Sequence, residues 1–574
     1  MSASRLARHP SAVALAIAAV IAPVLVVAVG QLRFVGDRAV PVGDDAVLEL
    51  NMRSALSGHQ LLGPWSRYGD VGGWFHPGPL MYYLFAPLYW LGGRRHGALA
   101  IAALLLAAAA LAAIVVMIAV RYGLCAALAA SAVLLVYEWR FGLDQLRSPW
   151  NPLIVILPLV VVIVAAQTIT TGSGRWLPMI AVFAGSVAVQ SHLGAAPVVG
   201  AMLIYAIVVS ARSRRTFVHQ WGPAFALGVL LWLPPLYQQL RRGRAGNLAL
   251  IVKWFVRVGP RGDRGNTPAL IVKALLLQPA HLGRWFGPEG SWNVMPATTW
   301  TAWATAALGF AALVAVVAVS RRRSVAGLRR LGAPAIALAV GIVALYRTTD
   351  PPAPYLATPL IAVGLSIWIA LTATLADLTV GTVAPVAPVA PVAPVAPVAG
   401  AAADAADASG LDRWRRQLGA LAVVGAIVPL IASPAHTTEA FRSFAASERV
   451  STPAMASLDR SLGAVCDEST RSVRVALDGS AWSAALGAGV ALQRCGKSVQ
   501  FTPDLRPLVG NRYTDESKVP ALTVLFGCID APVPRDARLL TTIKGVSADE
   551  TANVSVVPST NIEAGSLTVH TCPS

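Results

Sequence analysis

Two long uncharged runs near the N-terminus constrain the fold of this chain most strongly. Residues 10–30 and 97–120 span 21 and 24 residues, and neither run contains a charged side chain. As helices rising about 1.5 Å per residue, both are long enough to cross a hydrocarbon core about 30 Å thick. The mean hydropathy is +0.61, and 13% of residues are charged, against about 25% in soluble chains. The sequence therefore predicts a polytopic α-helical membrane protein.

The positive charge of the chain lies almost entirely in its apolar part. The formal net charge is +18, but residues 436–574 carry 13 Lys and Arg against 14 Asp and Glu, which leaves 33 against 14 before them. The densest basic clusters, at residues 212–215, 321–330 and 413–416, lie beside apolar runs. Lys and Arg in such places are typical of the cytoplasmic side. We therefore expect the lipid bilayer as a partner and no nucleic acid.

The basic clusters predict a multi-pass protein of the cell membrane with about 11–13 transmembrane helices. Arg5 and Arg8 place the N-terminus inside, and the first span lacks the small-residue cleavage site of a signal peptide, so we expect it to be retained. The predicted parts are a transmembrane module 1–378 with outer loops 31–76 and 241–300, a cytoplasmic linker 379–416, a last transmembrane helix 417–434 and an extracytoplasmic domain 435–574.

The stretch between residues 77 and 211 leaves two arrangements open. Its apolar runs are residues 77–92, 97–120, 124–137, 153–169, 177–189 and 194–211. An outside start and an inside end require an odd number of crossings, so these six runs cannot all cross separately. Either residues 177–211 form one long broken helix, or the short run 77–92 does not cross. The choice determines the side on which residues 138–151 lie.

The linker and the C-terminal domain differ in composition from the spans. Residues 383–399 repeat Ala-Pro-Val, and a proline at every third position favours a stiff polyproline II spacer. A docking role for a proline-reading partner is the less favoured alternative. The C-terminal domain is predicted as a small α/β unit, with strands at 473–477, 498–502, 521–526 and 567–570 and a helix at 481–494.

Four of the five cysteines fall in this C-terminal domain. They are Cys466, Cys495, Cys528 and Cys572, while Cys125 lies alone in an apolar run. An even count in a domain predicted to lie outside suggests two disulfides. Three pairings are open, and we favour Cys466 with Cys495 and Cys528 with Cys572. A zinc site is the weaker interpretation, because the metal-binding spacings CxxC and HxxxH are absent.

Polar residues at membrane depth mark candidate sites. Gln190 and His192 interrupt an apolar stretch, and such residues tend to face a cavity or the bundle interior. The alternative, a polar pair that joins two helices, is equally open. Asn151 before Pro152 is explained as a helix N-cap. The sequence has no P-loop, Rossmann glycine fingerprint or hydrolase elbow, so nucleotide-driven chemistry is not expected.

Several motifs together resemble one superfamily of membrane enzymes. The first outer loop contains GDDAVLEL, LLGPWSRYG and the start of HPGPLMYYLFAPLY, and later segments read SPWNPLIVILP, VAVQSHLG, LGVLLWLPPLYQQL and PYLATPL. This set resembles the GT-C superfamily of polyprenyl-phosphate-sugar-dependent glycosyltransferases, which includes protein O-mannosyltransferases and aminoarabinose transferases. It is most similar to a group of actinobacterial GT-C-like membrane proteins, mostly of unassigned substrate. WSAALGAGVALQRCG in the C-terminal domain resembles that group's outer domain.

The resemblance implies transfer of a sugar from a polyprenyl-phosphate donor to a glycan, glycolipid or protein acceptor of the cell envelope, at the outer face. Asp44 would serve as the base, and Asp45 would orient the acceptor or help Asp44 hold a divalent cation, Mg or Mn. Loop 241–300 would form a lid over the donor pocket. His281 and Glu289 in this loop are weaker candidates, either to support the residues that contact substrate or to bind a metal. The residues expected to contact substrate are Arg53, Arg67, His76, Arg140, Arg147, Gln190, His192, Arg347 and Tyr355.

Simpler interpretations accompany these roles. An acidic pair after a span is often a solvated helix start, and arginines at membrane ends often bind lipid head groups. Two other functions also stay open: a lipid or glycan transporter or flippase, and a catalytically inactive GT-C-like scaffold that binds glycan.

Overall fold

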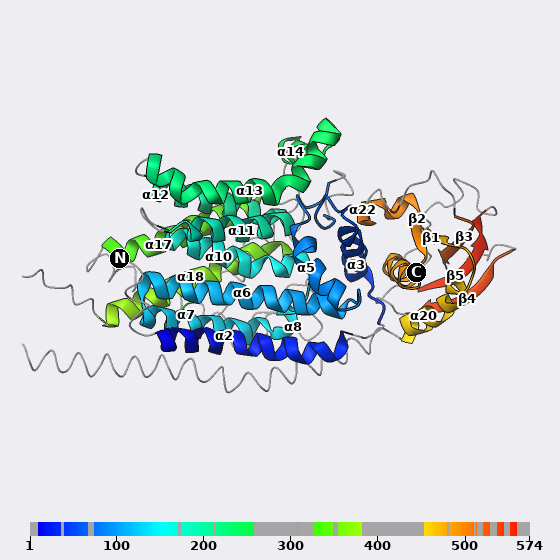
Figure 1. Cartoon of the computed structure of the whole chain (residues 1–574), viewed down its shortest axis with the longest axis horizontal. Helices are drawn as coiled ribbons and strands as arrows, with labels where there is room; N and C mark the ends of the chain where they lie inside the picture. Colours follow the sequence, from blue (N-terminus) through cyan, green and yellow to red (C-terminus); the bar gives the residue numbers. More distant parts are fainter. Residues whose placement is uncertain are drawn as a thin grey trace, which may run out of the picture.

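The fold consists of a helical bundle with an α/β domain at one end of it (Figure 1). The computed structural model describes residues 10–35, 39–66, 74–169, 174–211, 214–257, 325–347, 354–380, 453–478, 481–509, 520–528, 536–544 and 551–559, with Tyr513 among a few isolated positions. Most of loop 241–300, nearly all of linker 379–416 and all of the last span 417–434 lie outside the described residues, so those predictions stay predictions.

The bundle is built from apolar helices, as the uncharged runs predicted. It contains α2 (Pro10–Gln31), α6 (Gly97–Tyr122), α7 (Leu124–Phe141), α10 (Ile156–Thr168), α11 (Trp176–Ser191), α12 (Ala196–Ser210), α13 (Arg214–Arg242), α17 (Val325–Tyr346) and α18 (Thr358–Val380). Five helical segments of the described residues are long and apolar enough to cross a membrane. This confirms a polytopic helical protein, while the predicted total of 11–13 spans includes residues outside this description.

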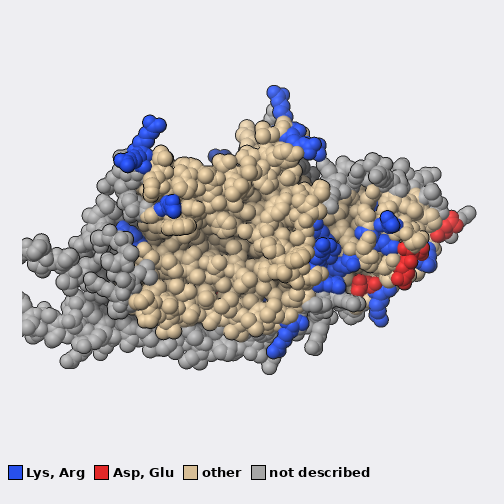
Figure 2. Space-filling model, in the orientation of Figure 1, with Lys and Arg blue, Asp and Glu red and all other residues tan. Residues whose placement is uncertain are grey.

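The outer surface of the bundle suits a lipid environment. Large apolar side chains point away from the core, among them Leu15 and Val208, which are 71% and 70% exposed. Figure 2 shows that Lys and Arg gather toward the two ends of the bundle, whereas the acidic residues visible in this view lie on the α/β domain. Exposed apolar area of this extent is typical of a membrane-spanning surface.

Helix α5 (Leu80–Leu91) resolves the open arrangement between residues 77 and 211. Its start lies beside the end of α11, where the Leu80 amide donates to Gln190 Oε1 at 3.2 Å, and the turn after it returns to α3 (Gly43–Leu56), where Arg53 donates to the Arg94 carbonyl at 3.2 Å. Both ends of α5 therefore lie at the α/β-domain end of the bundle. The run 77–92 does not cross, while α11 and α12 are separate helices joined by η2 (Leu193–Ala195).

The α/β domain has a five-stranded sheet in the order β2-β1-β3-β5-β4. Strands β1 (Ser472–Asp478), β2 (Ser498–Phe501) and β3 (Leu522–Gly527) are parallel, and β5 (Thr551–Pro558) and β4 (Arg538–Lys544) extend the sheet in antiparallel fashion. Helix α21 (Trp482–Arg494) connects β1 to β2, since parallel strands need a crossover. The predicted first three strands and the helix are present, whereas α20 (Pro453–Cys466), β4 and β5 were not predicted. The strand expected at 567–570 lies outside the described residues.

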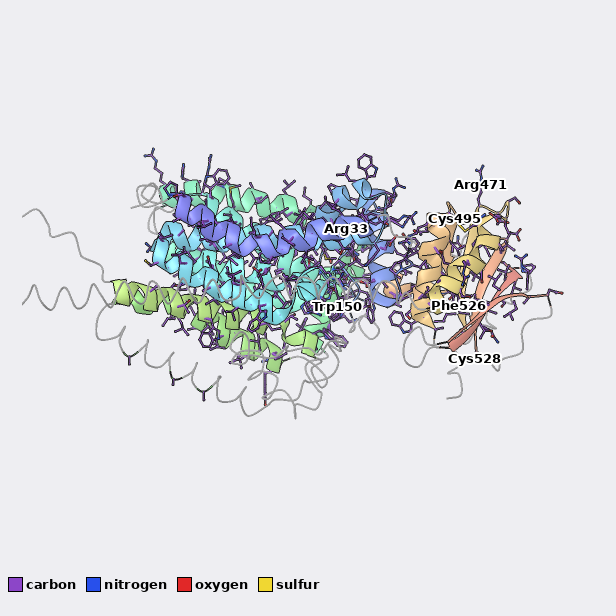
Figure 3. All side chains as sticks on the ribbon, turned by 90° about the horizontal axis from the view of Figure 1, so that it is seen from below. Arg33, Trp150, Arg471, Cys495, Phe526 and Cys528 are labelled. Carbon is purple, nitrogen blue, oxygen red and sulfur yellow. A yellow bond between two sulfur atoms is a disulfide. The ribbon has the colours of Figure 1, made fainter. Side chains whose placement is uncertain are left out.

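A disulfide closes one side of this domain. Cys466 at the end of α20 is bonded to Cys495 directly after α21, which is the favoured pairing. Cys528 is also disulfide-bonded, and Cys572, its predicted partner, lies outside the described residues. Figure 3 shows Cys495 and Cys528 at different places on the domain.

Helix α3 lies between the bundle and the α/β domain and packs against both. One face, with Ala46, Val47 and Leu50, joins the hydrophobic core of the α/β domain. Another face, with Leu48 and Met52, packs against α5 and the start of α6. The segment after the first span therefore contains a helix that is buried on two sides, and this helix begins with the acidic pair.

Candidate functional site

The acidic pair occupies the first turn of α3. Asp44 and Asp45 follow Gly43, at which the helix starts, and the Val42 side chain before it offers no capping oxygen. Carboxylates are favoured at this position, because the unpaired amides of a helix N-terminus carry partial positive charge. The helix end thus explains why the two acids lie here, and it directs them to the junction between bundle and α/β domain.

Asp44 is held by a tryptophan of the bundle. Trp150 Nε1 donates to Asp44 Oδ2 at 3.0 Å, and the Trp150 ring lies against the Tyr355 ring, with centroids 5.6 Å apart. Trp150 precedes α9 (Asn151–Ile154), and Tyr355 lies in η5 (Pro354–Ala357). Figure 3 shows Trp150 at the end of the bundle that faces the α/β domain. Asp44 is therefore bonded to one distant segment, and that segment packs against another.

The surroundings of Asp44 favour proton exchange. Desolvation by the surrounding protein raises the pKa of Asp44, the neighbouring Asp45 raises it further, and the Trp150 hydrogen bond lowers it in part. The Asp44 side chain nevertheless retains contact with solvent. A reachable carboxylate with a raised pKa is a suitable general base, because its pKa moves toward the working pH.

Asp45 has a different environment. Its Oδ1 lies 3.7 Å from Nε2 of His96, whose Nδ1 lies 3.9 Å from Oε2 of Glu49. The two aspartates of the pair thus contact different neighbours. Among the residues that the structure describes, no group of three or more His, Cys, Asp or Glu could hold a metal ion.

Glu49 is the most highly coordinated carboxylate near the site. It is fully buried and accepts from Arg494 at 3.2 and 2.9 Å, from Arg53 at 3.1 Å and from Tyr89 Oη at 3.0 Å. Burial raises its pKa, but the opposite charges of Arg494, His96 and Arg53 and the Arg494 hydrogen bonds outweigh burial, so the pKa of Glu49 is lowered. Glu49 is therefore ionised and fixed in place.

His76 and His192 form a buried stacked pair, with ring centroids 5.1 Å apart. The Leu193 amide donates to His76 Nδ1 at 3.0 Å, which places any ring proton on Nε2. Burial and then the His192 ring hold the pKa of His76 well below its usual range. His76 is therefore neutral. The two rings lie beside η2, the short helix that separates α11 from α12.

Gln190 joins three segments of the bundle. Its Oε1 accepts from the Leu80 amide at 3.2 Å, and its Nε2 donates to the Leu231 carbonyl at 2.9 Å. Pro235 in α13 has no amide hydrogen and cannot bond that carbonyl, so Gln190 supplies the missing donor. The amide of Asn151 similarly donates to the Ser191 carbonyl at 3.0 Å. These contacts correspond to the alternative in which polar residues join helices.

The predicted arginines are spread over several places. Arg53 pairs with Glu49 on α3, Arg147 lies half-buried three residues before Trp150, and Arg347 is exposed just after α17. Arg140 lies on α7, but its side chain and all of Arg67 lie outside the described residues, as do His281 and Glu289. Among the described arginines, Arg147 is closest in sequence to the Asp44–Trp150 pair.

Glu49 and Arg494 were not among the predicted site residues, although both lie in the motifs GDDAVLEL and WSAALGAGVALQRCG. Arg494 is the one charged residue of α21, and Glu49 lies between the apolar residues Leu48 and Leu50 of α3. A charge among apolar neighbours needs a partner when it is buried. That signal was available in both helices. What the sequence could not show is that the two helices meet, because 445 positions separate the residues.

The chain is similar in structure to a known protein, although its sequence alone finds no match. No family model matches the sequence, and no curated protein matches it. A solved structure of ArnT from Cupriavidus metallidurans bound to undecaprenyl phosphate is similar, with a TM-score of 0.56 and 13% identity, over 96% of this chain and 98% of that chain. The apo state of the same protein gives a TM-score of 0.53 and 13% identity, over 94% and 97%.

At this identity the likeness concerns the fold, and its coverage is wide enough to include both the bundle and the α/β domain. It agrees with the fold that the motif resemblance implied and does not test the actinobacterial group. The chain therefore has an ArnT-like GT-C fold.

Proposed function

We propose that this protein is a GT-C-type membrane glycosyltransferase that moves a sugar from a polyprenyl-phosphate donor to a cell-envelope acceptor. The acceptor would be a glycan, glycolipid or protein, and the reaction would occur at the extracytoplasmic face. One observation carries the proposal. An acidic helix start, with Asp44 held by Trp150, lies at the junction of bundle and α/β domain in a fold shared with ArnT, which has been solved with undecaprenyl phosphate.

The proposed reaction transfers one proton and releases one leaving group. Asp44 would accept the proton of the acceptor hydroxyl while that oxygen attacks the anomeric carbon. The bond from this carbon to the phosphate oxygen breaks, and polyprenyl phosphate leaves with the electron pair. Arg147 is our candidate to stabilise the leaving phosphate, because it is half-buried and close in sequence to Trp150. We derive no step through Mg or Mn, because the part of the chain that the structure describes contains no group of three or more His, Cys, Asp or Glu that could hold the ion.

A membrane assay tests the proposal. Membranes containing the protein are incubated with radiolabelled decaprenyl-phosphate sugars of several kinds, both pentoses and hexoses, and label transfer to envelope material is measured. We expect at least one donor to turn over with the wild type and transfer to fall to background with Asp44→Ala. If no donor turns over and the protein instead moves labelled lipid between leaflets, the transporter alternative is favoured and the proposal is wrong.

A further inference from the structure

We propose that Arg494 of the α/β domain is a positioning residue for Asp44, acting through the buried carboxylate of Glu49. The inference rests on the proposed function, because it treats Asp44 as the base. It assigns the α/β domain a part in catalysis. In this account the domain fixes the helix that carries the base, so the bundle alone would not hold the base in place.

The Arg494 guanidinium binds the chain at two places. Its Nε and Nη2 donate to the two carboxylate oxygens of Glu49 at 3.2 and 2.9 Å, while its Nη1 donates to the Ala39 carbonyl at 2.8 Å. A guanidinium is rigid and planar, so three such bonds define both the position and the orientation of their partners. Ala39 and Glu49 lie on either side of Asp44 in the sequence. Arg494 therefore holds the chain before and after the base.

The ion pair of Arg494 with Glu49 is buried. The Glu49 side chain is fully buried and that of Arg494 is 9% exposed, so water cannot replace either partner. A buried charge that loses its partner is costly, which makes the pair unlike the many surface ion pairs that contribute little. Tyr513 adds a second link from the α/β domain, because its hydroxyl donates to the Leu50 carbonyl at 2.8 Å.

Arg494 is itself fixed within the α/β domain. It ends α21, and the next residue, Cys495, is bonded to Cys466 on α20. At the other side of α3, Asp44 is bonded to Trp150 of the bundle. The base is thus held from two directions, by the bundle at its carboxylate and by the α/β domain through the helix that carries it.

The test uses four variants: Arg494→Lys, Arg494→Gln, Glu49→Gln and the double variant Glu49→Gln/Arg494→Gln. We expect Arg494→Gln and Glu49→Gln each to lower kcat at saturating donor by about 10²-fold, with the donor KM little changed, because misplacement of about 1 Å costs that much. Arg494→Lys should recover part of the loss. Since both residues act as one unit, the double variant should lose no more than either single variant.

Hydrogen exchange of the α3 peptides provides a readout that does not depend on activity. Arg494→Gln should speed exchange over residues 43–56 and leave the bundle peptides unchanged. Arg538→Gln is the matched control, because it removes an arginine of the same domain whose pair with Glu468 is largely exposed. The control should leave both exchange and kcat at their wild-type values.

The outcomes separate this inference from the proposed function. If the wild type transfers no sugar, the proposed function fails, and faster α3 exchange in Arg494→Gln would show only that Arg494 holds the helix. If single variants do not fold, the double variant still decides, because it removes both charges of the buried pair. Arg53, which also loses its carboxylate partner there, is 15% exposed and keeps its bond to the Arg94 carbonyl. A double variant with full kcat and wild-type α3 exchange would overturn the proposal.

Discussion

The indole of Trp150 limits the rise in the pKa of Asp44. Its hydrogen bond stabilises the charged carboxylate and so opposes the rise in pKa that desolvation and Asp45 cause. Trp150→Phe keeps an aromatic ring beside Tyr355 but removes the donor. The pKa of Asp44 should then rise further, and because the base works in its charged form, the acidic limb of the pH profile of kcat/KM should move to higher pH. We expect the shift of the acidic limb to be small, since Asp44 keeps solvent contact.

Trp176→Phe is the control for this prediction. Trp176 starts α11 at the opposite end of the bundle and is 64% exposed, so its replacement should leave the profile unchanged. An acidic limb that stays in place in Trp150→Phe would show that Trp150 does not control this carboxylate.

Single residues were the hardest features to predict from the sequence. The acidic pair at the start of α3 could be identified, because a polar helix start after a long span is visible in the sequence. The partners of Asp44 and Glu49 could not, since Trp150 and Arg494 come from distant segments and side-chain meetings depend on tertiary packing. The predicted N-cap at Asn151 was wrong, because Trp150 takes that position and the Asn151 side chain donates to the Ser191 carbonyl instead.

At the scale of elements, α21 and the segment before α3 approach closely because Gly487 has no side chain. A Cβ added there would lie 2.7 Å from the Pro41 carbonyl oxygen and 2.9 Å from Met455 Cε. Gly487→Ala should therefore push the α/β domain away from α3 and destabilise the protein by about 1–3 kcal/mol. We expect a lower thermal midpoint and reduced transfer activity.

Gly463→Ala provides the matched control in the same domain. Gly463 lies in α20 with open space where a Cβ would point, so alanine should raise stability by about 0.5–1 kcal/mol through helix propensity. Equal effects of both substitutions on the thermal midpoint would contradict the close approach at Gly487.

Elements with a strong periodic or apolar signal were predicted well. The first span, the helix at 481–494 and the first three strands appear close to the expected bounds. The short run 77–92 was ambiguous, because an apolar run of this length suits a buried helix as well as a span. The run forms the 12-residue helix α5, and its contacts with α3 and α11 decide that it does not cross. Strand β4 was missed because the adjacent polar residues Thr541 and Thr542 interrupt its apolar pattern. Strand β5 was missed although Ala552, Val554 and Val556 alternate with polar residues, which is a strand signal.

At the scale of the whole molecule, the non-crossing α5 fixes which loops share a side. Residues 57–66, 92–96 and 142–151 should all lie on the side of the α/β domain. Single cysteines introduced as His59→Cys, Arg94→Cys and Arg175→Cys in a Cys125→Ala background test this, since all three positions are exposed. A membrane-impermeant maleimide should label Arg94→Cys and His59→Cys from the same side and Arg175→Cys from the other. Labelling of Arg94→Cys together with Arg175→Cys would mean that α5 crosses.

The central claim is that Asp44 is the base of a sugar-transfer reaction. The most direct measurement is kcat of purified Asp44→Asn at saturating donor and acceptor, with Asp45→Asn as the control variant of the same pair and hydrogen exchange to confirm the fold. Asparagine keeps the shape and can still accept from Trp150, but it cannot take a proton, so kcat should fall about 10²–10⁴-fold. Asp45→Asn should lose distinctly less. Wild-type kcat in folded Asp44→Asn would contradict the account.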